Sequence, residues 1–293
     1  MASIREIVRY LCLTPPADVI RRLRGRAGLI GKVEAHRLGI LRSRAALRVQ
    51  KLVDFLNRYE MILERAVDWR RLDFEGARVL ELGAGPLLGW GPLALFRGAS
   101  QFVAVDPGWR PEVLNDPEIA KAYFRPLWRD LSAIYGPRMD FPVFMQALRE
   151  RAAAYAAPAH AAALDGHFDI VLSNSCLEHI APLDETLKRI ADLTAEGGRF
   201  LHLVDFGNHR PTPGPFDGLY DRTPEAARRR RRDINLLRAS DILHMFEAND
   251  TATALVPYAS VAPDEIGPVD PAWRAQYDDA TLAIKTAIFA SRP

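Results

Sequence analysis

The chain has 293 residues, of which 48% are hydrophobic and 26% are charged, a balance that is typical of globular proteins and excludes wholesale disorder. Its 39 basic and 37 acidic residues leave a net charge of +2, so no global field favours nucleic acid as a partner. The two cysteines, Cys12 and Cys176, suggest neither a disulfide framework nor a paired metal motif. No apolar run reaches the roughly 18 residues of a membrane span, and we expect a cytoplasmic protein.

The first 72 residues carry a helical pattern. Apolar side chains at Ile4, Ile7 and Leu11 recur at the spacing of one helix face, and a long helical run extends from about residue 29 to residue 69. No strand pattern interrupts this segment. We therefore expect residues 1–72 to form a helical N-terminal extension or lid, and a homodimer surface or an amphipathic element that leans on a membrane are open alternatives for it.

From residue 73 to residue 293, strand and helix patterns alternate along the chain. Short apolar segments predict strands over 77–82, 101–105, 168–172, 199–204, 253–258 and 282–290. Helical patterns over 88–96 and 183–193 fall between them. This alternation is typical of βαβ units and of a mainly parallel sheet, so we expect one α/β domain over 73–293.

The segment that follows the second strand, residues 109–163, is too long for a connection without structure of its own. It carries helical patterns over 118–134 and 144–156. We therefore expect an inserted helical cap at about 109–163, packed by its own aromatic side chains.

A glycine-containing turn follows the first strand. Gly83 and Gly85 let a ligand approach the backbone closely, and the helix that comes next offers free N–H groups. Asp106 ends the second strand, 21 residues after Gly85, where an acid accepts hydrogen bonds from ribose hydroxyls. A turn that binds a nicotinamide dinucleotide would have a third glycine where this chain has Leu88. The acid Glu81 disfavours a pyrophosphate and favours a ligand with an amino group or a positive charge. The pattern therefore predicts a site for a nucleoside other than NAD(P).

Four segments in chain order resemble the motifs of the class I S-adenosylmethionine-dependent methyltransferases. They are residues 79–85 (VLELGAG), Asp106, residues 168–179 (FDIV to LEH) and residues 196–200 (EGGRF). The resemblance implies an α/β fold with a seven-stranded, mostly parallel, doubly wound sheet. It also implies S-adenosylmethionine as the cofactor that donates the methyl group.

The same resemblance implies which residues hold the cofactor. The methionine part lies against Glu81, Gly83, Ala84 and Gly85, and the ribose lies against Asp106.

Backbone at Ser173 and Asn174 is implied to enclose the sulfonium and its methyl group. In relatives an acid after the third strand contacts the adenine, and His160 stands at the corresponding place in this sequence. We therefore take His160 as the expected adenine contact, a departure from the pattern of the family.

A narrower resemblance begins in the fifth strand. His202, Asp205, Asn208 and His209 follow the spacing of the His-x-x-Asp-x-x-Asp-His signature of a bacterial methyltransferase group, with Asn208 in place of the second Asp. Such proteins are associated with surface-polysaccharide or specialised-metabolite modification. The resemblance implies a glycan or another small molecule with a hydroxyl group as the acceptor.

The expected acceptor contacts lie in two further segments. Asn235 and Arg238 belong to a stretch that is similar to the Asn-x-x-Arg-x-Ser segment of the same group, and His179 follows the fourth strand. We expect all three side chains to bind the substrate.

Methylation of a hydroxyl group requires removal of its proton, and a general base contributes ~10²–10⁴-fold. His202 and His209 lie within or just after the fifth strand, at the sheet edge where ligands bind in open α/β folds. We expect His209 to be the catalytic base, with His202 as the alternative and Asp205 as the residue that orients either imidazole. His202 and Asp205 are three apart, so a regular strand points them to opposite faces.

Glu178 and His179 raise the alternative of a metal site, because some class I methyltransferases bind a divalent ion through an acid-x-x-Glu-His segment and a further His. Ser175 stands where the first acid is required, and Asp205 or His209 is the alternative ligand in a set that would suit Mg²⁺ or Mn²⁺. We therefore expect no metal, and hydrogen bonds of Glu178 and His179 at the start of a helix.

Residues 228–232 are five consecutive arginines, which spread around a helix axis and predict a solvated face; phosphate binding is the alternative. The expected function is methyl transfer to a hydroxyl of a small molecule or glycan. N-methylation, RNA methylation and an inactive methyltransferase-like binding protein are the alternatives that remain open.

Overall fold

The structure is a computed structural model that describes residues 50–109, 111–157, 162–210 and 212–292. The expectations for the first 49 residues and for His160 lie outside the described residues.

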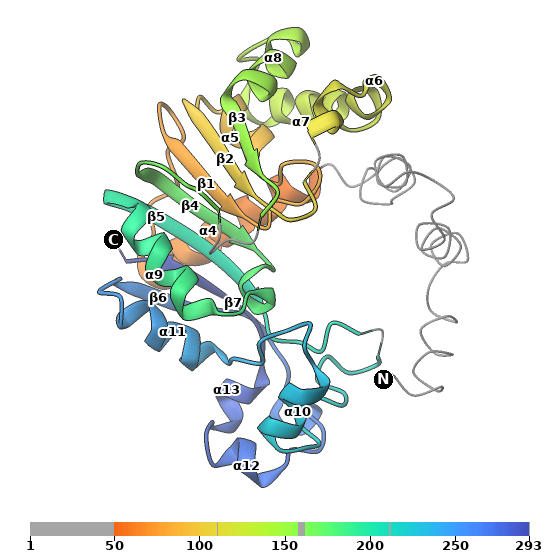
Figure 1. The fold of residues 1–293 in the computed structure, drawn as a ribbon, viewed down its shortest axis with the longest axis vertical. Helices are drawn as coiled ribbons and strands as arrows, with labels where there is room; N and C mark the ends of the chain where they lie inside the picture. The colour runs from red at the N-terminus through yellow and green to blue at the C-terminus, as the bar shows by residue number, and fades with distance from the viewer. Residues whose placement is uncertain (1–49, 110, 158–161, 211, 293) are drawn as a thin grey trace.

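Seven strands form one sheet in the order β3-β2-β1-β4-β5-β7-β6 (Figure 1). The pairs from β3 through β5 are parallel, whereas β7 runs antiparallel to both β5 and β6. This confirms the expected seven-stranded, mostly parallel sheet. The strands are β1 Arg78–Leu82, β2 Gln101–Val105, β3 Ala152–Tyr155, β4 Phe168–Asn174, β5 Thr194–Asp205, β6 Thr253–Ser260 and β7 Ile284–Ser291.

Helices cover both faces of the sheet, because its strands are apolar on both sides. In β1, Val79 packs with one layer and Leu80 with the other. The layer on the Val79 side contains α4 Gln50–Val67, α5 Gly91–Phe96, α7 Arg125–Tyr135 and α8 Phe141–Arg151. The layer on the Leu80 side contains α9 Leu183–Leu193 and α11 Ala239–Glu247.

Helix α4 shares the main core with the sheet. Its side chains Val53, Leu56, Tyr59 and Leu63 are buried, and their spacing is that of one helix face. Residues 53–72 therefore pack directly against the strands that carry the glycine turn.

The insert after β2 contains the expected helices and one strand that the pattern did not indicate. It consists of η2 Pro111–Asn115, α6 Pro117–Ile119, the π-helical turn η3 Ala120–Phe124, α7, α8 and β3. The helix expected over 144–156 ends at Arg151. The sequence of β3, Ala-Ala-Ala-Tyr, has neither β-branched residues nor alternation, so only its parallel pairing with β2 makes it a strand.

A smaller helical cluster lies at the end of the molecule opposite the insert (Figure 1). It contains α10 Pro224–Arg230, η6 Pro263–Glu265, α12 Pro271–Arg274 and α13 Asp279–Ala283, packed around Tyr220, Trp273 and Leu282. Among the five consecutive arginines, Arg231 is buried rather than solvated and binds Asp233. Within the described ranges, no helix is both long enough and apolar enough to cross a membrane.

Candidate active site

The glycine turn follows β1 at the carboxyl edge of the sheet. Gly83 and Gly85 have φ angles of 71° and 67°, which L side chains adopt at a cost. A Cβ atom on Gly83 would lie 2.6 Å from the sulfur of Cys176, which follows β4. A Cβ on Gly85 would meet no atom within 4 Å. Cys176 therefore packs closely against Gly83, whereas the space beside Gly85 is open, as the close approach of a ligand requires.

Asp106 at the end of β2 faces this turn. One carboxylate oxygen accepts the N–H of Gly85 at 2.8 Å, and the other accepts the N–H of Gly108 at 2.6 Å. Each carboxylate oxygen has a further lone pair, and Asp106 is only half-buried. Asp106 can thus accept ribose hydroxyls beside the open space at Gly85, and the turn fits the nucleoside cofactor that the sequence predicted.

Glu81 has a different position from the one expected of a ligand contact. Its side chain is 2% exposed, accepts the N–H of Trp90 at 2.7 Å, and occupies the space in which Gly89 would need a Cβ. Burial raises the pKa of its carboxyl to about 8, and the N–H of Trp90 partly offsets that rise. Glu81 therefore supports the loop of residues 83–90 from inside the core, and the expectation of a direct cofactor contact is corrected.

The two residues at the end of β4 point to opposite layers. The amide oxygen of Asn174 accepts a hydrogen bond from the hydroxyl of Tyr59 at 2.9 Å, which places Asn174 beside α4. Ser173 is fully buried on the other side, and its hydroxyl lies 2.8 Å from Nδ1 of His202. The Ser173 side chain is therefore unavailable to a ligand, and only its backbone remains a candidate contact.

His202 does not fit the role of a catalytic base. Its ring is fully buried, packs parallel to Phe200 and Phe246, and faces the layer of α11. Burial lowers the pKa of this imidazole to about 3, because the charged form would lose its hydration. A group without access to solvent or substrate cannot remove an acceptor proton, so the alternative role for His202 is corrected.

His209 lies past the end of β5, and its side chain is 20% exposed. Its Nε2 is 3.0 Å from the backbone carbonyl of Asp205, so Nε2 carries the hydrogen and Nδ1 keeps a lone pair. The carboxylate of Asp205 instead accepts the N–H of Gly207 and lies 3.3 Å from Nζ of Lys285. Asp205 thus orients His209 through its carbonyl rather than through its side chain.

His179 and Glu178 lie beside His209. They belong to η5 Leu177–His179, the turn that follows β4. The rings of His179 and His209 are 4.8 Å apart, and Oε1 of Glu178 is 3.9 Å from Nε2 of His209. Glu178 is 3% exposed, and burial raises the pKa of its carboxyl to about 8. The structure therefore brings Glu178 and His179 together with His209, a grouping that the sequence offered only through the alternative of a metal site.

Asn235 and Arg238 support the site instead of reaching a substrate. The amide of Asn235 donates to the carbonyls of Leu177 and Ile180, which fixes the turn η5. Arg238 is 2% exposed and donates to the carbonyl of Phe206 and to the hydroxyl of Tyr220. Both expectations of substrate contact are corrected, because Arg238 is buried and the Asn235 amide is used by internal hydrogen bonds.

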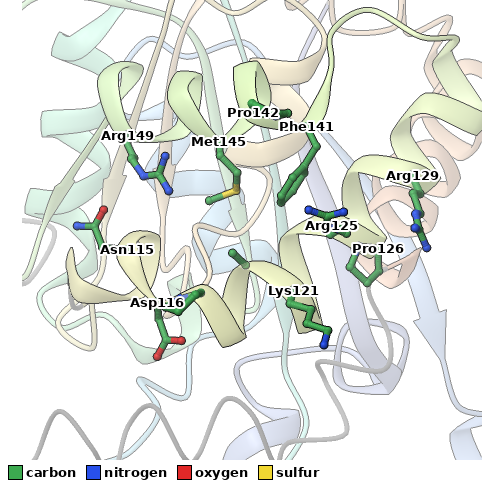
Figure 2. A pocket seen from close by; sticks show the side chains of 12 residues that line it. Asn115, Asp116, Lys121, Arg125, Pro126, Arg129, Phe141, Pro142, Met145 and Arg149 are labelled. Atoms are coloured by element: carbon green, nitrogen blue, oxygen red, sulfur yellow. The ribbon is translucent and has the colours of Figure 1, made fainter.

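A separate cavity of about 940 Å³ lies between α8 and the helices α6, η3 and α7 of the insert (Figure 2). Phe141, Met145 and four basic side chains line it, but Arg125 stacks on Phe141 at 4.6 Å and Arg149 donates to the carbonyl of Leu114. No lining residue belongs to the glycine turn or to the histidine cluster. We assign this cavity no part in the chemistry at the sheet edge.

The strand order, the antiparallel β7 and the glycine turn backed by Asp106 define the class I methyltransferase fold. A sequence profile described as "Methyltransferase domain" matches residues 53–254, and the chain belongs to this family. The protein is a methyltransferase, and S-adenosylmethionine is its methyl donor. Among curated proteins, no match to the chain was found.

Several solved structures are similar to the chain at low identity. An S-adenosylmethionine-dependent methyltransferase from Mesorhizobium loti shares 13% identity over 76% of this chain and 93% of that one, with a TM-score of 0.44. A protein from Listeria monocytogenes described with the same activity shares 13% over 80% and 99%, with a TM-score of 0.41. A phosphoethanolamine N-methyltransferase from Haemonchus contortus shares 15% over 80% and 52%, with a TM-score of 0.44.

Proposed function

We propose that this methyltransferase transfers the methyl group to a hydroxyl of a small molecule or glycan. The observation that carries the proposal is the cluster of Glu178, His179 and His209 at the carboxyl edge of β4 and β5. An amine acceptor needs little help in losing a proton, whereas a hydroxyl group needs a base or an equivalent group at this position.

The cluster is connected to the proposed cofactor site by a very short piece of chain. Cys176 contacts Gly83 of the glycine turn, and Glu178 and His179 follow two and three residues later. The residues that would hold the cofactor are Gly83, Ala84, Gly85 and Asp106 with the backbone of Ser173 and Asn174. The bound cofactor supplies an electrophilic methyl group on sulfur.

The residues of the chain have two tasks in this proposal. The turn and Asp106 fix the cofactor, so that the acceptor oxygen can be aligned with the methyl group and the sulfur; such positioning is worth roughly 7–11 kcal/mol. His209 keeps the lone pair of Nδ1 and serves the deprotonation of the acceptor, while the carbonyl of Asp205 holds its ring.

Paired acceptors test the proposal. We expect transfer of a labelled methyl group from S-adenosylmethionine to phenolic and sugar hydroxyls, measured beside the matched amines in which –NH₂ replaces the reacting –OH. Preference for the hydroxyl member of each pair supports the proposal. Transfer to the amine members alone, or to RNA alone, contradicts it.

A further inference from the structure

Two imidazoles and one carboxylate converge beside the proposed acceptor position. Glu178, His179 and His209 each offer a ligand atom, and these atoms lie within 4.8 Å of one another. One metal ion bound at about 2.0–2.2 Å from each ligand atom holds two ligands at most about 4.4 Å apart. The three side chains would therefore move slightly closer together on binding, and the ring of His209, whose Nε2 is the nitrogen 3.9 Å from Glu178, would turn to present Nδ1.

Backbone carbonyls fix the tautomers of both histidines. Nδ1 of His179 lies 2.7 Å from the carbonyl of Asp233, and Nε2 of His209 lies 3.0 Å from the carbonyl of Asp205. A carbonyl accepts only, so each of these nitrogens carries the hydrogen and the other ring nitrogen keeps its lone pair. A backbone carbonyl behind each imidazole is typical of histidines that bind metals.

Glu178 supplies an independent observation. One of its oxygens accepts the N–H of Asp205 at 3.3 Å, but Oε2 is buried without a hydrogen-bond partner. The side chain is only 4% exposed, and a buried carboxylate oxygen without a partner is costly. Oε1 is the oxygen that lies 3.9 Å from Nε2 of His209, so a cation that binds both oxygens of this carboxylate would satisfy Oε2.

Buried polar residues hold the three candidate ligands in place. Arg231 binds the carboxylate of Asp233 and the carbonyl of Asn208, and these two residues adjoin the segments that carry the histidines. Asn235 fixes the turn of Glu178 through the carbonyls of Leu177 and Ile180. Such a supporting layer is what keeps metal ligands in position.

We propose that Glu178, His179 and His209 bind one divalent transition-metal ion. Two imidazoles with one carboxylate favour Zn²⁺, Mn²⁺, Fe²⁺ or Co²⁺ over Mg²⁺, which prefers oxygen ligands. Three protein ligands leave positions open for the acceptor. This revises the sequence-based expectation of no metal, since His209 takes the place of the acid that Ser175 lacks.

The role of the ion rests on the proposed function. A hydroxyl group bound to a divalent ion loses its proton to solvent at a lower pH than a free one, and its oxygen then attacks the methyl carbon. The new bond is O–CH₃, and the sulfur keeps the electron pair of the broken S–CH₃ bond. When the ion is bound, the Nδ1 lone pair of His209 binds the ion. His209 then promotes deprotonation of the acceptor through the ion and does not accept the proton itself.

Co²⁺ titration of the full, untagged chain after dialysis against EDTA tests the site. We expect about one equivalent of Co²⁺ to give the intense visible absorption of four- or five-coordinate cobalt, and Zn²⁺ to abolish it. His179→Ala, which removes an exposed ligand, should weaken this binding at least about tenfold. His244→Ala removes an exposed histidine of α11 and is the matched control, expected to bind as the wild type.

A wild-type titration that shows only the weak spectrum of hydrated cobalt contradicts the proposal. Equal affinities of the wild type and His179→Ala contradict it as well, and Glu178→Gln provides a second variant with the same expectation of weaker binding. Binding of S-adenosylhomocysteine is measured on the same metal-free samples. A protein that binds S-adenosylhomocysteine but not Co²⁺ would contradict the metal site alone. A protein that does not bind S-adenosylhomocysteine would contradict the proposed function.

Discussion

The sulfur of Cys176 lies against the α-carbon of Gly83, so that the position where a Gly83 side chain would begin is only 2.6 Å from that sulfur. This contact joins the loop after β4 to the glycine turn after β1. Burial raises the pKa of the Cys176 thiol to about 12, which keeps it neutral and makes it a packing group. The cofactor turn and the segment that carries Glu178 therefore keep a fixed relation to each other.

The two glycines of the turn should respond differently to substitution. Gly83→Ala combines a positive φ with a collision at Cys176, whereas Gly85→Ala has the positive φ but free space. We expect Gly85→Ala to lose about 1–2 kcal/mol of unfolding free energy from backbone strain alone, and Gly83→Ala to lose more. Urea denaturation measures both.

The double variant Gly83→Ala/Cys176→Gly provides the control for this comparison. Removing the Cys176 side chain relieves the collision but not the strain, so the penalty of the alanine should fall toward that at Gly85. Equal penalties at Gly83 in the two backgrounds would show that the contact with Cys176 does not constrain the turn.

Glu81 predicts a specific pH dependence of stability. Because burial raises its pKa to about 8 in the folded state, the folded chain binds more protons than the unfolded chain between about pH 4.5 and 8. Stability from this group is therefore lost as the pH rises through that window. Glu81→Gln keeps the shape and the acceptor for Trp90, and it should gain on the wild type by on the order of 1 kcal/mol per pH unit.

Urea midpoints at pH 5.5, 6.5 and 7.5 measure this gain. Glu185→Gln, an exposed acid of α9, is the control and should follow the wild type at every pH. Glu178 carries a shift of the same sign but is present in all three proteins, so it cancels. If the urea midpoints of Glu81→Gln and the wild type changed in parallel with pH, the carboxyl of Glu81 would not be buried in its protonated form.

Arg238 should prove to be a residue of the fold. Its guanidinium donates to the carbonyl of Phe206 and the hydroxyl of Tyr220, and lies over the ring of Trp273 at 5.9 Å. We expect Arg238→Ala to lower the unfolding free energy by about 2–5 kcal/mol, since it empties a buried space and leaves polar groups without partners. Arg229→Ala on exposed α10 should lose almost nothing.

A substrate-binding role for Arg238 would give another result. In that case the variant would unfold at the wild-type urea concentration and show only a raised KM for the acceptor. Equilibrium denaturation beside steady-state kinetics therefore distinguishes the two roles.

His209→Ala should lower turnover by ~10²–10⁴-fold while the affinity for S-adenosylhomocysteine stays unchanged, because the residue serves the acceptor and not the cofactor. His244→Ala, elsewhere on the surface, should keep full turnover. Full activity of His209→Ala would show that His209 takes no part in the reaction. A loss of affinity for S-adenosylhomocysteine would show that His209 serves the cofactor and not the acceptor.

Much of the fold follows from the sequence because its strands are strongly apolar. The strand expected over 101–105 is β2, residue for residue, and the opposite faces expected for His202 and Asp205 are confirmed by their register in β5. Strand β3 was not predictable, since three alanines carry no strand pattern and their conformation depends on pairing with β2.

The candidate site was predicted less well, because spacing along the chain does not reveal burial. The sequence favoured His209 over His202 only because His209 follows the strand. It did not reveal that the His202 ring is stacked against Phe246 of α11, whereas the His209 side chain keeps 20% of its surface exposed. The contact between His179 and His209 depends on Asn235 and Arg231, which hold two distant loops together. No local pattern contains that information.

The central claim is that the glycine turn and Asp106 bind the nucleoside of S-adenosylmethionine. Calorimetric titration with S-adenosylhomocysteine tests it on the wild type, on Asp106→Ala and on Asp192→Ala, an exposed acid of α9. We predict that Asp106→Ala weakens binding by about 1–3 kcal/mol through lost hydrogen bonds to a charged group, and that Asp192→Ala does not change it. Equal affinities of Asp106→Ala and the wild type would contradict the claim.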